Sequence, residues 1–199
     1  MILLTSNAQH LYWLGRYLTR IRFFCQQYPF TEQSAAKRFT DSFGLPTQNV
    51  VDLNFALLDP QQSYSLVAQL SSIKDNIDEL RGVLATETYA KLNRFLRAMN
   101  QQSSEICSLI EDCYPILQEN LTQDGVLFLQ LGQLIELLDI GLRFNQDIAP
   151  IITQMQQQEE TLSIYAWYNP IAWQQFKTQP NLTALYQFHH EFLQAIGGD

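Results

Sequence analysis

Two stretches of the chain share one pattern, LYWLGRYLTRI at residues 11–21 and FLQLGQLIELL at residues 128–138. Aligned without gaps, they place Gly15 on Gly132, each inside a run of apolar residues at helical spacing. A glycine inside a helix costs on the order of 1 kcal/mol relative to alanine. Close approach of a neighbouring backbone offsets that cost. The repeat therefore predicts two central helices that cross at Gly15 and Gly132.

The surrounding sequence is also helical in pattern. Apolar residues recur at three- and four-residue steps, and no strand pair with a hairpin turn is recognisable. The clearest of these segments are 66–84, 89–99, 106–113 and 185–196. Residues 124–147 are apolar on nearly all sides, which is typical of a helix enclosed by others. The pattern predicts an all-α bundle of about six or seven helices in one domain spanning residues 1–199, with segments 5–27 and 124–147 at its centre.

Two regions break the helical pattern. Residues 31–58 read as short helical pieces separated by Gly44-Leu45-Pro46. Pro115 is expected to interrupt the helix that begins near Ile106, because proline lacks a backbone N–H and clashes with the preceding turn. The glutamines around Gln156 are interpreted as a solvated helix end.

Charge restricts the classes of partner. The chain carries 12 Lys+Arg against 20 Asp+Glu, a formal net charge of -8, and its dense basic stretch is Arg16, Arg20 and Arg22. Duplex nucleic acid and anionic bilayers would be repelled. The N-terminal segment lacks a basic region followed by an apolar run, and no window reads as apolar for the roughly 18 residues of a membrane span. We expect a cytoplasmic protein with neither nucleic acid nor membrane as partner.

The three cysteines are predicted to be reduced. Cys25, Cys107 and Cys113 are irregularly spaced, too few for a disulfide framework, and placed in apolar helical patterns. Such residues are typical small members of a core.

Glu136 is the most informative charged residue. It lies four residues after Gly132, on the same side of a largely apolar helix, where an unpaired carboxylate is costly. Arg16, Arg20 and Arg22 are its candidate partners. One interpretation is a structural ion pair that fixes the orientation of the helices. The other is that Glu136 and an arginine line a pocket.

Other chemistry has little support in the sequence. No glycine-rich phosphate loop is present, so neither ATP binding nor another cofactor is expected. His189 and His190 point about 100° apart on a helix and do not read as a metal site. His10 and Cys25 are separated by roughly 22 Å along one helix, which excludes a nucleophile–base pair.

Aromatic residues cluster around the Asn169-Pro170 helix start. The cluster comprises Tyr165, Trp167, Tyr168 and Trp173. Core filling is one interpretation, and a partly exposed anchor for a partner protein is the other.

Three segments together resemble the bacterial alpha-E proteins, an all-helical family named for a Glu-Arg motif. Residues 12–20, Tyr-Trp-Leu-Gly-Arg-Tyr-Leu-Thr-Arg, resemble the N-terminal signature of that family, Y-W-x-G-R-Y-x-E-R. Residues 131–137, Leu-Gly-Gln-Leu-Ile-Glu-Leu, resemble its later L-G-R-x-x-E-R segment. Between them, a central stretch of the family is matched by Asn76, Arg81, Glu87, Leu92 and Asn93. The three matches occur in the family's order and cover about half of the chain.

The chain departs from the family pattern at both Glu-Arg motifs. Thr19 stands where the first motif has glutamate, although Arg20 remains. Leu137 stands where the second motif has arginine, although Glu136 remains. The chain is also shorter than typical members, and no match extends beyond about Ser163. A catalytic Glu-Arg pair would make this chain a degenerate copy, whereas a structural pair tolerates half-loss through repacking.

The resemblance implies a companion role. Alpha-E proteins look like parts of bacterial systems that pair them with ATP-grasp peptide ligases and transglutaminase-like proteins. We therefore expect an accessory or scaffold subunit of a peptide-synthesis or peptide-modification system, and a homodimer is compatible with the sequence. Its expected binding residues are Tyr12, Trp13, Asn76 and Arg81.

Two alternatives remain open from the sequence. One is an amide-forming or peptide-modifying enzyme, for which the catalytic candidates are Glu136, Arg16 and Arg20. The other is a sensor that binds a small ligand in a pocket of the bundle, and no specific residue supports it.

Overall fold

The structure, a computed structural model, describes residues 4–47, 49–102, 105–165 and 168–197. These residues form ten α-helices and one short 3-10 helix, and no strand is found among them. The prediction of an all-α fold is confirmed, whereas six or seven helices was too few. Residue contacts divide the chain into two compact units. The prediction of a single domain stays a prediction, and each unit is described by itself.

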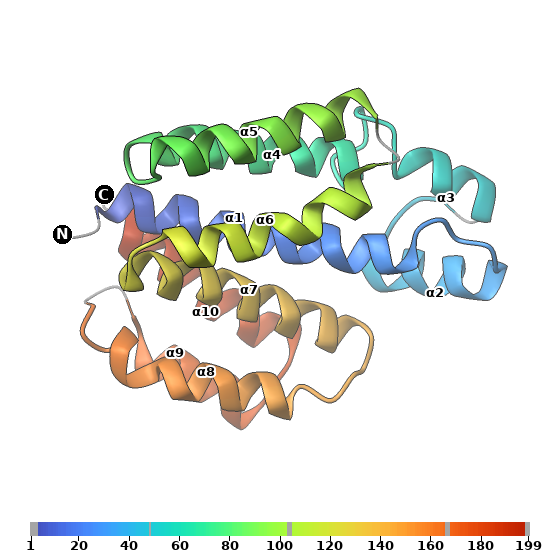
Figure 1. Cartoon of the computed structure of the whole chain (residues 1–199). Coiled ribbons are helices and arrows are strands. Elements are labelled where there is room, and N and C mark those ends of the chain that lie inside the picture. Colours follow the sequence, from blue (N-terminus) through green and yellow to red (C-terminus); the bar gives the residue numbers. More distant parts are fainter. Residues whose placement is uncertain (1–3, 48, 103–104, 166–167, 198–199) are drawn as a thin grey trace. The chain divides into compact units, whose positions relative to one another are not determined.

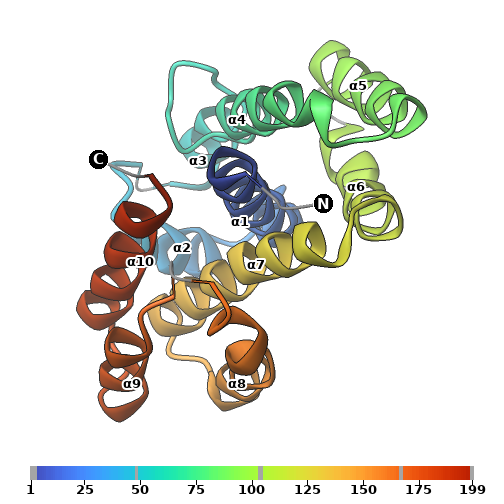
Figure 2. The same ribbon diagram turned by 90° about the vertical axis from the view of Figure 1, so that its left-hand side faces the viewer.

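The first unit contains the described residues up to Arg16 and those from Thr122 onward. Helix α1 (Thr5–Gln27) begins in it and continues into the second unit. The other helices of the first unit are α7 (Gln123–Arg143), α8 (Ala149–Leu162), α9 (Pro170–Thr178) and α10 (Leu182–Gly197). Helix α7 packs against α8 and α10, and α9 packs against α10 (Figures 1 and 2).

Helix α7 is the buried centre of the first unit, as its apolar composition predicts. It begins where the Thr122 side chain accepts a hydrogen bond from the Gly125 N–H. Contrary to the sequence analysis, α7 alone among the described helices is long and apolar enough to cross a membrane by length and composition. However, 72% of its most apolar window is buried inside the protein. Core helices of soluble proteins pass the same test.

Helix α8 was not predicted. Pro150 lies in its first turn, where a missing N–H costs nothing, so this proline starts a helix. The helix buries only Met155 and Leu162, which explains why its periodicity was hard to recognise. The interpretation of the glutamines as a helix end was wrong, because they lie inside α8. Gln154, Gln156 and Gln157 are exposed, whereas Gln158 donates to Gln130 of α7 at 3.0 Å.

The second unit runs from Tyr17 to Leu121 and completes α1. Its other elements are α2 (Gln33–Phe43), α3 (Val50–Ala56), α4 (Leu66–Glu79), the 3-10 helix η1 (Leu80–Gly82), α5 (Thr86–Gln101) and α6 (Ile106–Asn120). Helix α5 packs against α4 and α6, and α2 packs against α3. Two short helices with a break at Gly44 confirm the interpretation of residues 31–58. The expected interruption at Pro115 was wrong, since α6 continues through this residue.

A disulfide in the second unit corrects the prediction of reduced cysteines. Cys25 of α1 and Cys107 of α6 are bonded, with their Cα atoms 5.2 Å apart. Their separation of 82 residues gave no sign of this proximity, which only packing of the two helices creates. Cys113 is free and buried, as expected of a core residue. Burial, and then the charge of Asp112, raises the pKa of its thiol to about 12.

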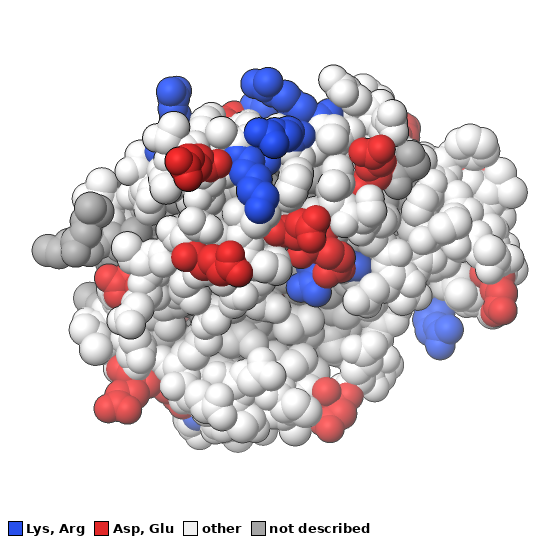
Figure 3. Space-filling view, viewed as in Figure 1, with Lys and Arg blue, Asp and Glu red and all other residues white. Residues whose placement is uncertain are grey.

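Lysine and arginine side chains gather over α5 on the face of the molecule shown in Figure 3. We call Lys91, Arg94 and Arg97 the cationic stripe, because they follow one another at three-residue spacing and are all exposed. These three positive charges lie together on one helix, although the whole chain has a net charge of -8.

Candidate functional site

The first unit contains the predicted helix crossing. A Cβ atom added to Gly15 would overlap the Leu129 carbonyl oxygen of α7, and one added to Gly132 would overlap the Tyr12 carbonyl oxygen of α1. Two backbones therefore touch where neither has a side chain. This contact confirms the prediction that both glycines mark where α1 and α7 cross.

The crossing is reciprocal. Leu129 lies three residues before Gly132, and Tyr12 lies three residues before Gly15. Each glycine thus receives the carbonyl oxygen that precedes the other glycine by three positions. The contact is therefore approximately symmetric between the two aligned segments.

The Arg16–Glu136 ion pair lies next to this crossing. Nε and Nη2 of Arg16 each donate to Oε2 of Glu136 at 2.9 Å. The exposed fraction of the side chain is 6% for Arg16 and 0% for Glu136. Burial, the largest single effect, would lower the pKa of Arg16, but the charge and hydrogen bond of Glu136, together with the charges of Tyr12 and Asp139, raise this pKa above its ordinary value. The guanidinium stays charged, and the predicted pairing of Glu136 with an arginine is confirmed.

His189 of α10 extends the pair into a network of four side chains, together with Tyr12. Nη1 of Arg16 lies 3.1 Å from Nε2 of His189, and the Tyr12 hydroxyl lies 2.6 Å from Nδ1. Arginine can only donate, so Nε2 is the acceptor and carries no proton. The imidazole is therefore neutral with its proton on Nδ1, which donates to the Tyr12 oxygen. A proton on Nε2 would remove the acceptor of the arginine hydrogen bond and place a positive imidazolium beside the positive guanidinium.

Aromatic contacts hold the histidine ring in place. Tyr12 stacks on His189 with ring centroids 5.6 Å apart, and Trp13 meets its edge at 5.3 Å. The guanidinium carbon of Arg16 lies 5.5 Å from the centre of the Trp13 ring. Of the predicted binding residues on α1, Tyr12 thus belongs to the network and Trp13 contacts it.

A second buried carboxylate lies one turn further along α7. Asp139 accepts from Nε of Arg143 at 2.9 Å and from the Tyr186 hydroxyl at 2.7 Å. The guanidinium of Arg143 also contacts this hydroxyl. Burial, followed by the bond to Asp139, raises the pKa of Tyr186 above its ordinary value. Asp139 is therefore bound directly to α10, whereas Glu136 is connected to α10 through Arg16 and His189.

The remaining predicted site residues belong to the second unit. Arg20 is half-buried on α1. Asn76 is buried on α4 and donates to the Ser72 carbonyl oxygen at 2.7 Å. Arg81 is exposed beside the Tyr89 ring, at 5.6 Å. Their prediction as binding or catalytic residues stays a prediction.

A group of polar residues surrounds this part of the second unit. The Tyr89 hydroxyl donates to Asp78 at 2.8 Å, and Lys74 donates to the same carboxylate at 2.6 Å. The bond from Lys74, supported by that from Tyr89, lowers the pKa of Asp78 despite partial desolvation. These contacts tie the end of α4 to the start of α5.

The aromatic cluster is core filling where the structure describes it. Tyr168 and Trp173 are 7% and 0% exposed. The Tyr168 hydroxyl donates to Glu159 of α8 at 3.0 Å. Tyr165 is half-buried, and Trp167 lies outside the described residues.

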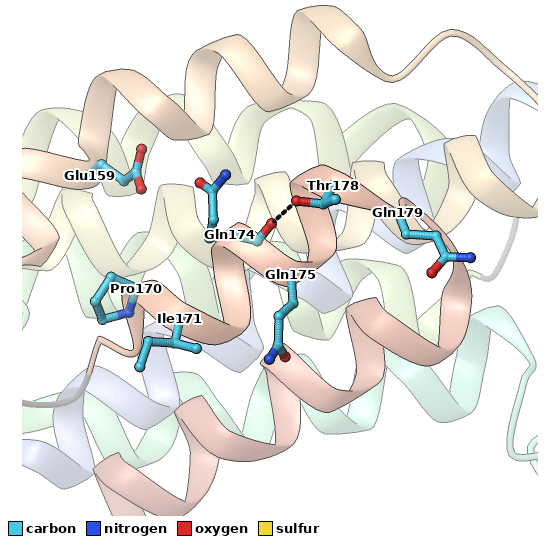
Figure 4. Close-up of a pocket in the computed structure, with 7 residues that line it drawn as sticks. All are labelled: Glu159, Pro170, Ile171, Gln174, Gln175, Thr178 and Gln179. Atoms are coloured by element: carbon cyan, nitrogen blue, oxygen red, sulfur yellow. Dashed lines mark hydrogen bonds between the residues drawn. The ribbon is translucent and has the colours of Figure 1, made fainter.

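An open depression of about 650 Å³ lies between α8 and α9 (Figure 4). Figure 4 shows Pro170 and Ile171 at the start of α9, three glutamines and Thr178 further on, and Glu159 on α8. It contains none of the residues of the polar network. The charged residue that lines it, Glu159, is bound to Lys177 at 3.4 Å.

Sequence reasoning missed His189 and the Asp139–Arg143–Tyr186 cluster. One signal for His189 was available, because it lies three residues before Phe192 and four after Leu185, both of which are buried. This places its ring at the border of the buried face of α10. The identity of its partners on α1 could not be read from that spacing.

The comparison with protein families finds a family whose model matches most of the chain. The family model called Alpha-E, described as a predicted alpha-helical domain with a conserved ER motif, matches residues 3–167. Neither the comparison with curated proteins nor that with solved structures gives a significant match. The matched range includes both glycines and the Arg16–Glu136 pair and ends before α9 and α10.

Proposed function

We propose, from the premise that this chain belongs to the Alpha-E family, that it is an accessory or scaffold subunit of a bacterial peptide-synthesis or peptide-modification system. Its partner would be an ATP-grasp ligase-type or transglutaminase-like protein, as the family resemblance implies. The chain then contributes binding and positioning, and its partner performs the chemistry.

One observation carries this proposal: the Glu136 carboxylate is 0% exposed. A catalytic carboxylate must reach a substrate atom, directly or through one water molecule. Glu136 instead faces two donors of Arg16, whose third nitrogen is bound to His189. The geometry is that of a structural pair which fixes how α1, α7 and α10 meet.

The pair also accounts for the half-lost motifs. The glutamate that remains in the second segment binds Arg16, which precedes the Glu-Arg position of the first segment by several residues. Thr19 and Leu137 therefore leave this cross-helix pair intact. An accessory subunit needs the pair for its shape, so loss of the other motif members is compatible with its function.

The test compares stability with activity. Glu136→Gln removes the charge that balances Arg16, and loss of one partner of a buried pair costs about 3–5 kcal/mol. We expect a lower melting temperature and partner binding that falls only in proportion to unfolding. Arg16→Met/Glu136→Gln, which removes both charges, is the matched control and should recover part of the loss. If Glu136→Gln kept full stability and abolished turnover of a peptide substrate, the enzyme hypothesis would replace this one.

Co-purification tests the companion role itself. The tagged full-length chain, expressed in its native cells, is expected to retain an ATP-grasp or transglutaminase-like protein. A clean monomer that retains neither would contradict the proposal. Light scattering of the same sample shows whether the chain self-associates, which stays a prediction.

A cytoplasmic location is likewise a proposal. The Cys25–Cys107 disulfide argues against it, because disulfides persist mainly in oxidising compartments. Alkylation of thiols in intact cells, followed by mass spectrometry, decides whether this bond exists there.

A further inference from the structure

The cationic stripe of α5 lacks internal partners. Among the described residues, none of Lys91, Arg94 and Arg97 takes part in an ion pair, hydrogen bond or ring contact. Most other cations of the chain are bound to a carboxylate, for example Arg22 to Glu111 and Lys177 to Glu159. The stripe is thus a local excess of unpaired positive charge on an acidic protein.

Packing of α5 fixes the direction of the stripe. The opposite side of the helix buries Leu92, Leu96 and Met99 in the second unit. This packing fixes which side of α5 faces solvent. Residues 91 to 97 rise about 9 Å along the axis, so the three charges form a short, outward-facing row.

The cation next to α5 in the chain is Arg81 of η1, and its charge acts on Asp78 of α4. Arg81, in the turn before α5, is exposed, and its guanidinium lies beside Tyr89 of α5. The one acidic residue of α5 is Glu87, in its first turn. The second half of the helix carries Arg94 and Arg97 and no acidic residue, and Figure 3 shows acidic side chains below the basic ones on the same face.

The chemistry of the stripe favours carboxylates over extended polyanions. Arginine binds carboxylate and phosphate alike, through paired N–H groups. A duplex, however, carries one charge per about 1.7 Å of axis and would extend past the stripe across the acidic remainder of the protein. A bilayer-binding helix presents large apolar side chains beside its cations. The exposed non-basic residues of α5 near the stripe are Ala90, Asn100 and Gln101.

We propose that the cationic stripe of α5 is a docking surface for a short acidic segment of a partner protein. This inference rests on the proposed function in one respect: it states the chemistry, a run of carboxylates, by which the proposed partner would be recognised. Charge complementarity of this kind accelerates encounter and selects the partner, and it is sensitive to salt.

The experiment uses the full-length chain and a fluorescein-labelled oligoglutamate of about twelve residues, read by fluorescence anisotropy at about 20 mM and 150 mM salt. Arg94→Gln/Arg97→Gln should weaken binding about five-fold at the lower salt. The control Lys37→Gln/Arg38→Gln removes two positive charges from exposed positions on α2 and should change it less than two-fold. All these side chains are exposed, and the ion pair that the control removes, Lys37–Asp41, is a surface pair, so melting temperatures should change little.

Several results would overturn the inference. They are no binding of the oligoglutamate, equal weakening by both variants, and tighter binding of a duplex oligonucleotide or of phosphatidylserine vesicles than of the peptide. The proposed function is judged separately. A co-purified partner without oligoglutamate binding refutes only the stripe, whereas oligoglutamate binding without any retained partner refutes the companion role.

Discussion

At the scale of single residues, one added methyl group tests the helix crossing. A Cβ at Gly132 would overlap the Tyr12 carbonyl oxygen, and it would lie 2.8 Å from the carbonyl carbon and 3.1 Å from the Arg16 nitrogen. These are backbone atoms, which cannot rotate away as a side chain does. We expect Gly132→Ala to lower the free energy of unfolding by about 3 kcal/mol, measured by urea denaturation.

Gly82→Ala is the matched control for this substitution. A Cβ at Gly82 meets no atom within 4 Å. The alanine also restricts the unfolded chain, so its effect should be neutral or stabilising by about 0.5 kcal/mol. Equal losses from both variants would mean that the crossing has no special role.

Adjacent histidines give a second comparison at this scale. His189→Phe keeps the ring contacts with Tyr12 and Trp13 but removes the acceptor for Arg16, which leaves a donor unsatisfied. We expect a loss of about 1–3 kcal/mol in thermal or urea unfolding. His190→Phe, at an exposed position, should change stability by less than about 0.5 kcal/mol. A larger loss from the His190 variant would refute the network as described.

At the scale of elements, the disulfide links α1 to α6, and the thiol chemistry of the protein follows from it. At pH 8 the native protein should show no reactive thiol, because two cysteines are bonded and burial raises the pKa of Cys113 to about 12. Ellman's reagent should detect one thiol per chain in the denatured protein. It should detect three when the protein is both denatured and reduced. Two thiols reacting in the native protein would contradict the bond.

The same thiol gives stability a dependence on pH. The folded state keeps the proton of Cys113 up to about pH 12, whereas the unfolded chain releases it near pH 9. The folded state therefore binds more protons between these values, and this contribution to stability falls as the pH rises above about 9. Cys113→Ala should flatten that part of the profile.

Removal of the disulfide should destabilise the second unit. Cys25→Ser/Cys107→Ser frees a loop of 82 residues, for which chain entropy alone suggests a loss of about 4.5 kcal/mol. Denaturation curves with and without reductant should differ by a similar amount in the wild type and coincide in the variant. Curves that coincide in the wild type would show that the bond contributes nothing.

Local pattern predicted the elements well but not their partners. Periodicity located α1, α4, α5, α7, α9 and α10, and the Gly44 break separated α2 from α3. It failed at α8, whose buried face has only two residues, and at Pro115, which the packing of α6 tolerates. Secondary structure follows from spacing, whereas a proline within a helix depends on what surrounds it.

The candidate site shows the same difference between features that local sequence predicts and contacts between distant residues that it does not. The cost of an unpaired buried carboxylate predicted an arginine partner for Glu136, and two mid-helix glycines predicted the crossing. The contact of His189 with Arg16 joins residues 173 positions apart, and Cys25 with Cys107 joins residues 82 apart. Neither pairing has a local sequence signal.

At the scale of the whole molecule, α10 completes the first unit although it lies outside the family match. It buries Leu185, Phe188, Phe192 and Ile196 and supplies His189 and Tyr186 to the polar contacts of α1 and α7. Burial of four such side chains contributes about 8 kcal/mol, comparable with the stability of a whole domain.

Truncation tests this role of α10. A chain that stops after Gln179 is expected to lose cooperative unfolding of the first unit and to bind a hydrophobic dye. Limited proteolysis should then cut within α7 to α9. A chain lacking only residues 198–199 is the control. A truncated chain with the wild-type melting temperature would contradict the prediction.

The reciprocal crossing of α1 and α7 also limits how the gene can change in length. Each helix packs a backbone carbonyl oxygen against the glycine of the other helix, so neither helix can shift along the other without breaking both contacts. One inserted codon between those for Tyr12 and Gly15 would rotate Gly15 by about 100° about the axis of α1 relative to Tyr12, and move it about 1.5 Å along that axis. Insertions and deletions should therefore accumulate in the connecting loops and be purged from these two four-residue windows.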